Sequence, residues 1–115
     1  MVKVLVVDDE PALREVLLLM LRQNGFRAEA AENGSLALAE LRRKSYDVIV
    51  LDMDMPVMGG MAFLKARALD AALLKIPVVI FSASEPIVIP GVFDWVEKPC
   101  LAGDLTAAIA RAILR

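Results

Sequence analysis

The sequence contains no histidine and a single cysteine, Cys100, among its 115 residues. Without histidine, the chain has no imidazole to act as a general base, to ligate a metal or to carry a phosphoryl group. One cysteine excludes an internal disulfide and a zinc site built from several cysteines. This cysteine content fits a reducing compartment, and we expect a cytoplasmic location.

The chain also lacks a strong excess of one charge and lacks long hydrophobic runs. Thirteen basic and 15 acidic residues give a net charge of −2, which does not predict a basic nucleic-acid surface. The apolar run at 16–21 is far shorter than the roughly 20 residues of a membrane span. Hydrophobic residues nevertheless make up 58% of the chain, so a disordered chain is excluded. We expect one soluble domain over residues 1–115, with no contact to nucleic acid or membrane.

Short apolar runs alternate with segments of helical periodicity along the chain. The runs at 2–7 and 47–51 show no polar alternation, which is typical of strands buried on both faces. The alternation of strands and helices along the chain predicts a parallel sheet covered by helices on both faces. We expect strands at 2–7, 26–30, 47–51, 77–81 and 93–96, and helices at 11–23, from the turn at 32–35 to about 44, at 61–74 and at 101–114.

Polar residues follow the expected strands at the points where the strands end. In an open α/β sheet the carboxyl ends of the strands form one edge, and ligands bind there. Three carboxylates at that edge would repel one another and raise their pKa values, and a divalent cation such as Mg²⁺ or Mn²⁺ would relieve the repulsion. A cation and an ammonium group beside a carboxylate suit phosphoryl transfer to that carboxylate. The residues are Asp8, Asp9, Asp52, Ser82 and Lys98.

With these residues in this order, the chain resembles the receiver domains of two-component response regulators, of the chemotaxis-regulator type. The resemblance spans nearly the whole chain. It is carried by Asp8-Asp9, by Asp52 within Val-Leu-Asp-Met-Asp-Met-Pro, by Ser82 after Val-Val-Ile-Phe, and by Lys98-Pro99. It implies a doubly wound, flavodoxin-like, five-stranded parallel sheet in the order 2-1-3-4-5.

The resemblance also implies a role for each matching residue. Asp52 would accept a phosphoryl group from a sensor histidine kinase or a histidine phosphotransfer protein. The Mg²⁺ or Mn²⁺ ion would be held by Asp9 and Asp52, by Asp8 through water, and by the backbone carbonyl of Asp54. Phosphoryl oxygens would be bound by Ser82 and Lys98, and the switch would consist of Ser82 and Trp95.

The family is not one of conventional enzymes, and we expect the chain to catalyse only its own phosphorylation and dephosphorylation. Its phosphorylation would switch contacts with a downstream protein that the sequence does not identify. These residues contain no DNA-binding output segment, so we expect either action through partners or a place in a longer protein.

One interval departs from the family pattern. The residues between Ser82 and Lys98 are fewer than the family usually has, and they include Pro86 and Pro90. Two prolines this close oppose a regular helix. We therefore expect the family's fourth helix to be shortened or missing and the signalling face to differ.

Other interpretations of the same residues stay open at this point. Asp8-Asp9 alone suits the start of a helix, Asp52 alone suits a turn, and Lys98 alone suits an exposed loop. A degenerate receiver would act as an interaction module without phosphorylation. The Asp52-Met-Asp54 sequence is also similar to haloacid-dehalogenase-type phosphatases, although Pro56 and the short chain argue against them. A nucleotide-binding flavodoxin-like module is least favoured, because acids stand where a phosphate loop is needed.

Overall fold

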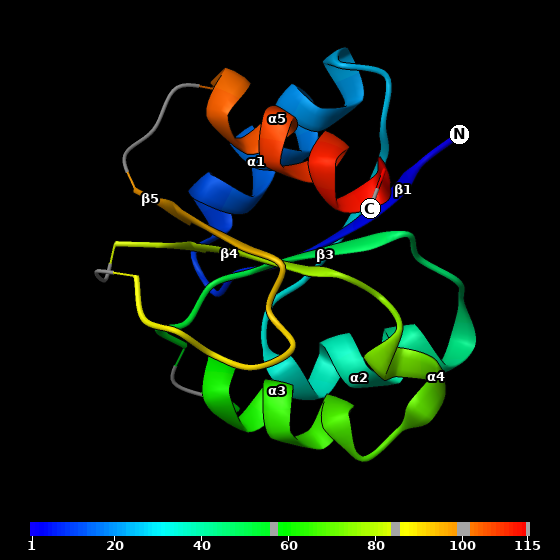
Figure 1. Cartoon of the computed structure of the whole chain (residues 1–115). Coiled ribbons are helices and arrows are strands. Elements are labelled where there is room, and N and C mark those ends of the chain that lie inside the picture. Colours follow the sequence, from blue (N-terminus) through cyan, green and yellow to red (C-terminus); the bar gives the residue numbers. More distant parts are fainter. Residues whose placement is uncertain (56–57, 84–85, 99–101, 115) are drawn as a thin grey trace.

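Strands and helices alternate along the chain in the computed structural model, which describes residues 1–55, 58–83, 86–98 and 102–114 (Figure 1). No helix in these ranges has both the length and the apolar character needed to cross a membrane. The strands are β1 (Lys3–Val7), β2 (Arg27–Ala31), β3 (Val48–Leu51), β4 (Val78–Ser82) and β5 (Asp94–Glu97). The helices are α1 (Pro11–Gln23), α2 (Gly34–Arg43), α3 (Gly60–Ala68), α4 (Ala71–Leu74) and α5 (Ala102–Leu114).

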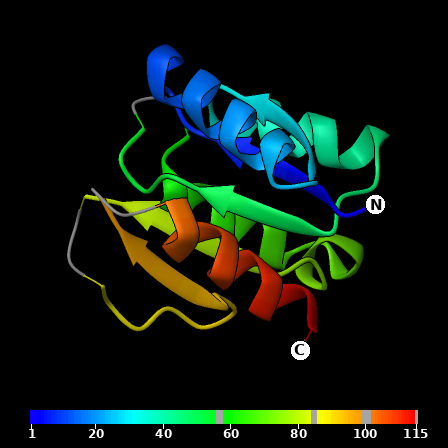
Figure 2. The ribbon, with the colours of Figure 1, turned by 90° about the horizontal axis from the view of Figure 1, so that it is seen from above.

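The strands form one parallel sheet in the order β2-β1-β3-β4-β5, which confirms the predicted fold class (Figure 2). The register aligns the strand ends, since Val7 at the end of β1 lies opposite both Ala31 of β2 and Leu51 of β3. At the other side of the sheet, Ser82 lies opposite Glu97. The residues that follow these positions therefore share one edge of the sheet.

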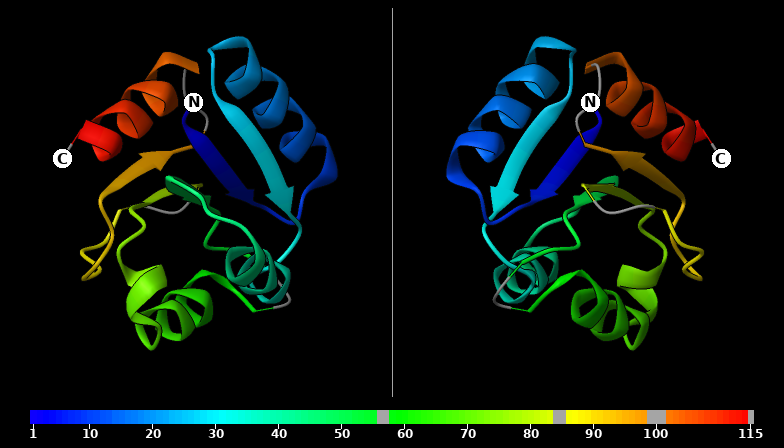
Figure 3. Two further views of the ribbon diagram at one scale, coloured as in Figure 1. Left: turned by 90° about the vertical axis from the view of Figure 1, so that its right-hand side faces the viewer. Right: turned by 90° about the vertical axis from the view of Figure 1, so that its left-hand side faces the viewer.

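Helices cover both faces of the sheet. Helices α1 and α5 lie on one face, and α2, α3 and α4 lie on the other (Figures 1 and 3). Alternate residues of each strand point to opposite faces, so the central strands supply both cores. Leu5, Ile49 and Ile80 are fully buried toward α2 and α3, whereas Val4, Val48 and Val79 are fully buried toward α1 and α5.

The predicted helix at 61–74 is wrong in one respect, because the structure divides it into α3 and α4. Asp70 interrupts the helix in an extended conformation, and its carboxylate accepts the backbone N–H groups of Ala72 and Leu73. Aspartate competes with the backbone for these bonds, and for this reason it favours helix starts over helix interiors. Apolar periodicity continues across residue 70 and did not indicate the break.

The segment between β4 and β5 confirms the predicted loss of the family's fourth helix, as far as residues 83 and 86–93 describe it. The helix labelled α4 precedes β4 and is a different element. A turn at Pro90 and Gly91 takes the place of a helix, and Gly91 adopts a φ of 84°, which favours glycine. Ile89 and Val92 pack against the core under α3, whereas Val88 is 99% exposed.

Substitution of Phe63 in α3 tests the core between the sheet and helices α2 and α3. Its side chain is fully buried, so we expect Phe63→Ala to lower the free energy of unfolding by about 3–5 kcal/mol in urea titrations. Leu69→Ala is the matched control, because Leu69 is 91% exposed and its truncation is expected to cost less than about 0.5 kcal/mol. Equal losses for the two variants would contradict this assignment of the core.

Candidate functional site

Three carboxylates converge at the carboxyl edge of the sheet, as the sequence predicts. Asp8 follows β1 and donates its backbone N–H to the carbonyl of Ala31, whereas Asp52 follows β3 and donates to the carbonyl of Val7. These bonds continue the sheet by one residue on each strand. One oxygen each from Asp8, Asp9 and Asp52 lies within 4.8 Å of the others. Asp8 and Asp52 are buried, and Asp9 is the more accessible of the three.

Lys98 follows the edge strand β5, and its side chain extends to the same carboxylates. Its backbone N–H donates to the carbonyl of Ser82 at 2.8 Å, which anchors the residue beside the end of β4. Its Nζ lies 3.1 Å from Oδ2 of Asp8 and 3.8 Å from Oδ1 of Asp52. The ammonium group is thus shared between two buried carboxylates and sits closer to Asp8. The surface-charge interpretation of Lys98 is wrong for this reason.

Burial is the main influence on the ionisation of Asp52. Loss of solvent raises the pKa of its carboxyl group from 3.8 to about 6. The N–H of Asp54, which donates to Oδ1 at 3.2 Å, and the charge of Lys98 act to lower this pKa, and the charges of Asp8 and Asp9 act to raise it. The oxygens of the three clustered carboxylates repel one another, and a nearby positive charge reduces this repulsion. Carboxylate oxygens are the ligands that a hard divalent cation such as Mg²⁺ prefers.

Asp8 also contributes to the turn between β1 and α1. Its Oδ1 accepts the N–H of Glu10, the residue that caps α1, at 3.0 Å. Its backbone carbonyl accepts a hydrogen bond from Nη1 of Arg14 at 2.9 Å. The helix-start interpretation therefore holds for Asp8 in addition to its place in the cluster. Sequence reasoning missed Arg14, because its position one turn into α1 gives no signal of a bond back to residue 8.

Ser82 and Asp54 meet at the neighbouring strand ends. Ser82 is fully buried at the end of β4, and its hydroxyl donates to Oδ2 of Asp54 at 3.4 Å. The family resemblance implies that the backbone carbonyl of Asp54 is a metal ligand, but it does not predict this side-chain contact. Adjacency of β3 and β4 brings the two residues together, and that adjacency becomes known only when the strand order is known.

Trp95 of β5 lies opposite Ile80 of β4 and packs against the core under α3. The structure thus gives Trp95 a packing contact on that face, whereas Asp8, Asp9, Asp52 and Lys98 gather at the strand ends. Pro99, which follows Lys98 in the sequence motif, lies outside the described residues.

Close backbone approach holds the loop that carries Asp52 against the start of α3. A Cβ atom on Gly60 would lie 2.8 Å from the Cα of Met53 and 3.1 Å from the carbonyl oxygen of Asp52. Real Cβ atoms essentially never approach other atoms within 3.0 Å, so the distance to the Cα of Met53 excludes a side chain here. The absence of a side chain at residue 60 therefore allows the loop after β3 to keep its course beside the carboxylates.

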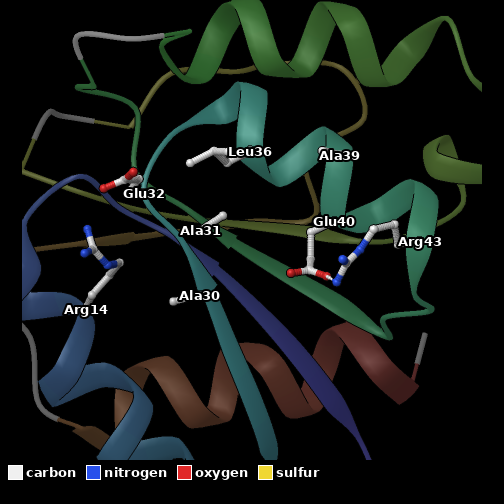
Figure 4. A pocket seen from close by; sticks show the side chains of 8 residues that line it. All are labelled: Arg14, Ala30, Ala31, Glu32, Leu36, Ala39, Glu40 and Arg43. Carbon is white, nitrogen blue, oxygen red and sulfur yellow. Dashed lines mark hydrogen bonds and ion pairs between the residues drawn. The ribbon is translucent and has the colours of Figure 1, made fainter.

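A groove of about 440 Å³ opens at the outer edge of β2, apart from the carboxylate cluster (Figure 4). Glu40 and Arg43 form an ion pair at one end, and Arg14 faces Glu32 at the other end. Ala30 and Ala31 form its floor. Arg14 belongs to both regions, because it lines the groove and also donates to the backbone carbonyl of Asp8.

Comparison with known proteins agrees with this geometry. Residues 4–110 match the family model of the response regulator receiver domain. The chain belongs to this family. The predicted resemblance is thereby confirmed, and so is the general function of a receiver domain in two-component signalling.

Relatives of this receiver domain include signalling proteins with longer chains. It is 36% identical over 124 residues to the sensory transduction protein RegX3 of Mycolicibacterium smegmatis, covering 100% of this chain and 51% of RegX3. The receiver domain thus spans about half the length of the curated relatives it matches.

Solved structures share its fold closely. The chemotaxis protein CheY4 of Vibrio cholerae is 30% identical with a TM-score of 0.88, and the match covers 97% of this chain and 98% of that chain. The response regulator TrrA of Thermotoga maritima, solved in complex with Mg²⁺–BeF, is 26% identical with a TM-score of 0.88, covering 97% and 99% of the two chains.

The raised pKa of Asp52 makes stability depend on pH in a defined direction. Because the folded-state pKa lies near 6 and the ordinary value is 3.8, this group favours folding below about pH 4 and loses that contribution as pH rises to about 6. In metal-free buffer we expect Asp52→Asn to be more stable than the wild type by about 1–3 kcal/mol at pH 7.5, with the difference vanishing near pH 4. Urea titrations in EDTA across this range measure it.

A difference that stays constant from pH 4 to 7.5 would contradict the assignment to the Asp52 carboxyl group. Glu32→Gln is a suitable control, because Glu32 follows β2 at the same edge of the sheet and is exposed. We expect its stability relative to the wild type to change little across the same pH range.

Proposed function

We propose that this receiver domain accepts a phosphoryl group on Asp52 and that the phosphorylated form alters its contacts with a downstream protein. The donor would be a phosphohistidine of a sensor histidine kinase or of a histidine phosphotransfer protein. The observation that carries the proposal is the buried Asp52 carboxylate, flanked by two further carboxylates and by the ammonium group of Lys98. This arrangement supports a nucleophilic carboxylate with positive charge held beside it.

The proposed reaction transfers the phosphoryl group from nitrogen to oxygen. An oxygen of Asp52 forms a bond to phosphorus as the bond from phosphorus to the donor imidazole nitrogen breaks, and the product is an acyl phosphate. Lys98 and the hydroxyl of Ser82 would bind phosphoryl oxygens. Positioning and charge neutralisation are the main requirements of such a transfer, and both groups already lie at the strand ends.

The acidic cluster would hold the divalent cation, Mg²⁺ or Mn²⁺. Side chains of Asp9 and Asp52 would ligate it directly, Asp8 would act through water, and the backbone carbonyl of Asp54 would add a ligand. When bound, the cation supplies positive charge that offsets the phosphoryl oxygens and the clustered carboxylates. The donor set supports this, because all the oxygens offered are of the hard type that Mg²⁺ prefers.

Residues 1–115 would form one receiver domain, cytoplasmic, without contacts to nucleic acid or membrane through this domain. It would catalyse only its own phosphorylation and dephosphorylation, and Ser82 with Trp95 would form its switch. No contact among the described residues favours a phosphorylation-independent module or a phosphatase of the haloacid-dehalogenase type.

Intact mass after incubation with Mg²⁺ and acetyl phosphate tests the acceptor. We expect the wild type to gain one phosphoryl group and Asp52→Asn to gain none, because the amide is not a nucleophile for phosphorus. Asp104→Asn is the matched control, since Asp104 lies in α5 and is expected to leave the gain intact. Labelling of Asp52→Asn at the wild-type level would contradict Asp52 as the acceptor.

Replacement of Lys98 separates phosphoryl binding from metal binding. We expect Lys98→Met to slow phosphorylation more than tenfold, because the ammonium group no longer offsets phosphoryl charge. Mg²⁺ should bind at least as tightly as in the wild type, because Asp8 loses the ion pair at 3.1 Å that competes with the metal. Titration calorimetry and a phosphorylation time course measure the two effects, and a parallel loss of both would contradict the separate roles.

A further inference from the structure

The hydroxyl of Ser82 already has an acceptor before any phosphoryl group arrives. It is fully buried and donates to Oδ2 of Asp54, which is an exposed carboxylate. A serine hydroxyl carries one proton and can donate to one acceptor at a time. If Ser82 is to donate to a phosphoryl oxygen on Asp52, its bond to Asp54 has to break.

Asp54 is also tied to the proposed acceptor through its main chain. Its backbone N–H donates to Oδ1 of Asp52 at 3.2 Å, while its side chain accepts from Ser82. One residue therefore contacts both groups that the proposed reaction would bring together. The loop after β3 passes close to Gly60 at Met53 and Asp52, the two residues that precede Asp54.

We propose that the Asp54 carboxylate restrains the hydroxyl of Ser82 in the unphosphorylated state and so opposes capture of the phosphoryl group. This inference rests on the proposed function of Asp52 and Ser82, and it assigns Asp54 as a positioning residue that acts through Ser82. The contact competes directly with the phosphoryl oxygen for one proton. Its loss would shift the equilibrium toward the phosphoryl-bound arrangement.

The charge of Asp54 acts in the same direction but through space. A carboxylate two residues from Asp52 repels a phosphoryl group, whether or not Ser82 is present. The hydrogen-bond competition, in contrast, requires the hydroxyl. A double-mutant cycle with Ser82→Ala therefore separates the two, because the repulsion persists in both backgrounds and cancels.

Affinity for beryllium fluoride at saturating Mg²⁺ measures phosphoryl capture without turnover. We expect Asp54→Ala to bind beryllium fluoride about twofold to tenfold more tightly than the wild type, the change that one net hydrogen bond produces. In the Ser82→Ala background, the same substitution should tighten binding by a smaller factor, because only the charge repulsion is then removed. Asp54→Asn keeps an acceptor oxygen, and it should gain less than Asp54→Ala. Titration calorimetry supplies all the values.

Two results would overturn the restraint. Weaker binding by Asp54→Ala would mean that Asp54 supports the site, and an equal gain with and without Ser82 would leave only charge repulsion. Glu32→Ala is the control for net charge, because it removes an exposed acid near Arg14 and the β2 edge groove. It should leave the affinity within about twofold of the wild type.

The wild type and Asp52→Asn distinguish failure of this inference from failure of the proposed function. If the wild type binds beryllium fluoride and Asp52→Asn does not, the acceptor assignment stands, and the cycle alone decides the role of Asp54. If the wild type fails to bind it at saturating Mg²⁺, the proposed function fails and the restraint fails with it.

Discussion

The burial of like charges at the ends of two adjacent strands is the constraint on which the site depends. Asp8 and Asp52 are both removed from solvent, and each is held there by a backbone bond that continues the sheet. Buried carboxylates are unfavourable unless positive charge or hydrogen-bond donors offset them. Lys98 supplies positive charge from β5, and the N–H groups of Glu10 and Asp54 supply donors. These groups offset the buried charge, and the proposed cation and phosphoryl group would bind at the same cluster.

The same contacts link four strand ends into one unit. Asp52 follows β3 and accepts from Asp54, Asp54 accepts from Ser82 at the end of β4, and the Ser82 carbonyl accepts from the backbone of Lys98 after β5. Lys98 closes the circuit by contacting Asp8, which follows β1. Under the proposed function, a change of charge at Asp52 would act on contacts of every central strand. This connection is the route by which the proposed phosphorylation would reach the surface formed by β4 and β5.

The surface beside β4 and β5 differs from the family pattern for a local reason. Residues 86–93 contain a turn at Pro90 and Gly91, with Gly91 in a left-handed conformation, and Ile89 and Val92 pack against the core under α3. The core beneath the sheet edge is thus covered without a helix. The proposed phosphorylation site and the covering segment are separable parts of the fold, because the site depends on strand ends and the covering depends on apolar packing.

Local sequence patterns determined the elements, the parallel sheet with its two covered faces, and the set of polar residues at the carboxyl edge. Buried strands and amphipathic helices follow from apolar spacing alone, and the parallel arrangement follows from their alternation. The prolines after Ser82 likewise excluded a helix by their own covalent geometry. The strand order came from the family resemblance rather than from these patterns, and the structure confirmed it.

Tertiary structure alone decided which polar groups touch. The break at Asp70 depends on hydrogen bonds to Ala72 and Leu73, and apolar spacing does not register them. Three contacts join residues from different parts of the fold. They are the bond from Ser82 to Asp54, the bond from Arg14 to Asp8, and the ion pair of Lys98, which lies closer to Asp8 than to Asp52. Such contacts depend on strand adjacency and side-chain direction in three dimensions. The sequence by itself thus determined which groups gather at the site, and the packed sheet decided how they pair.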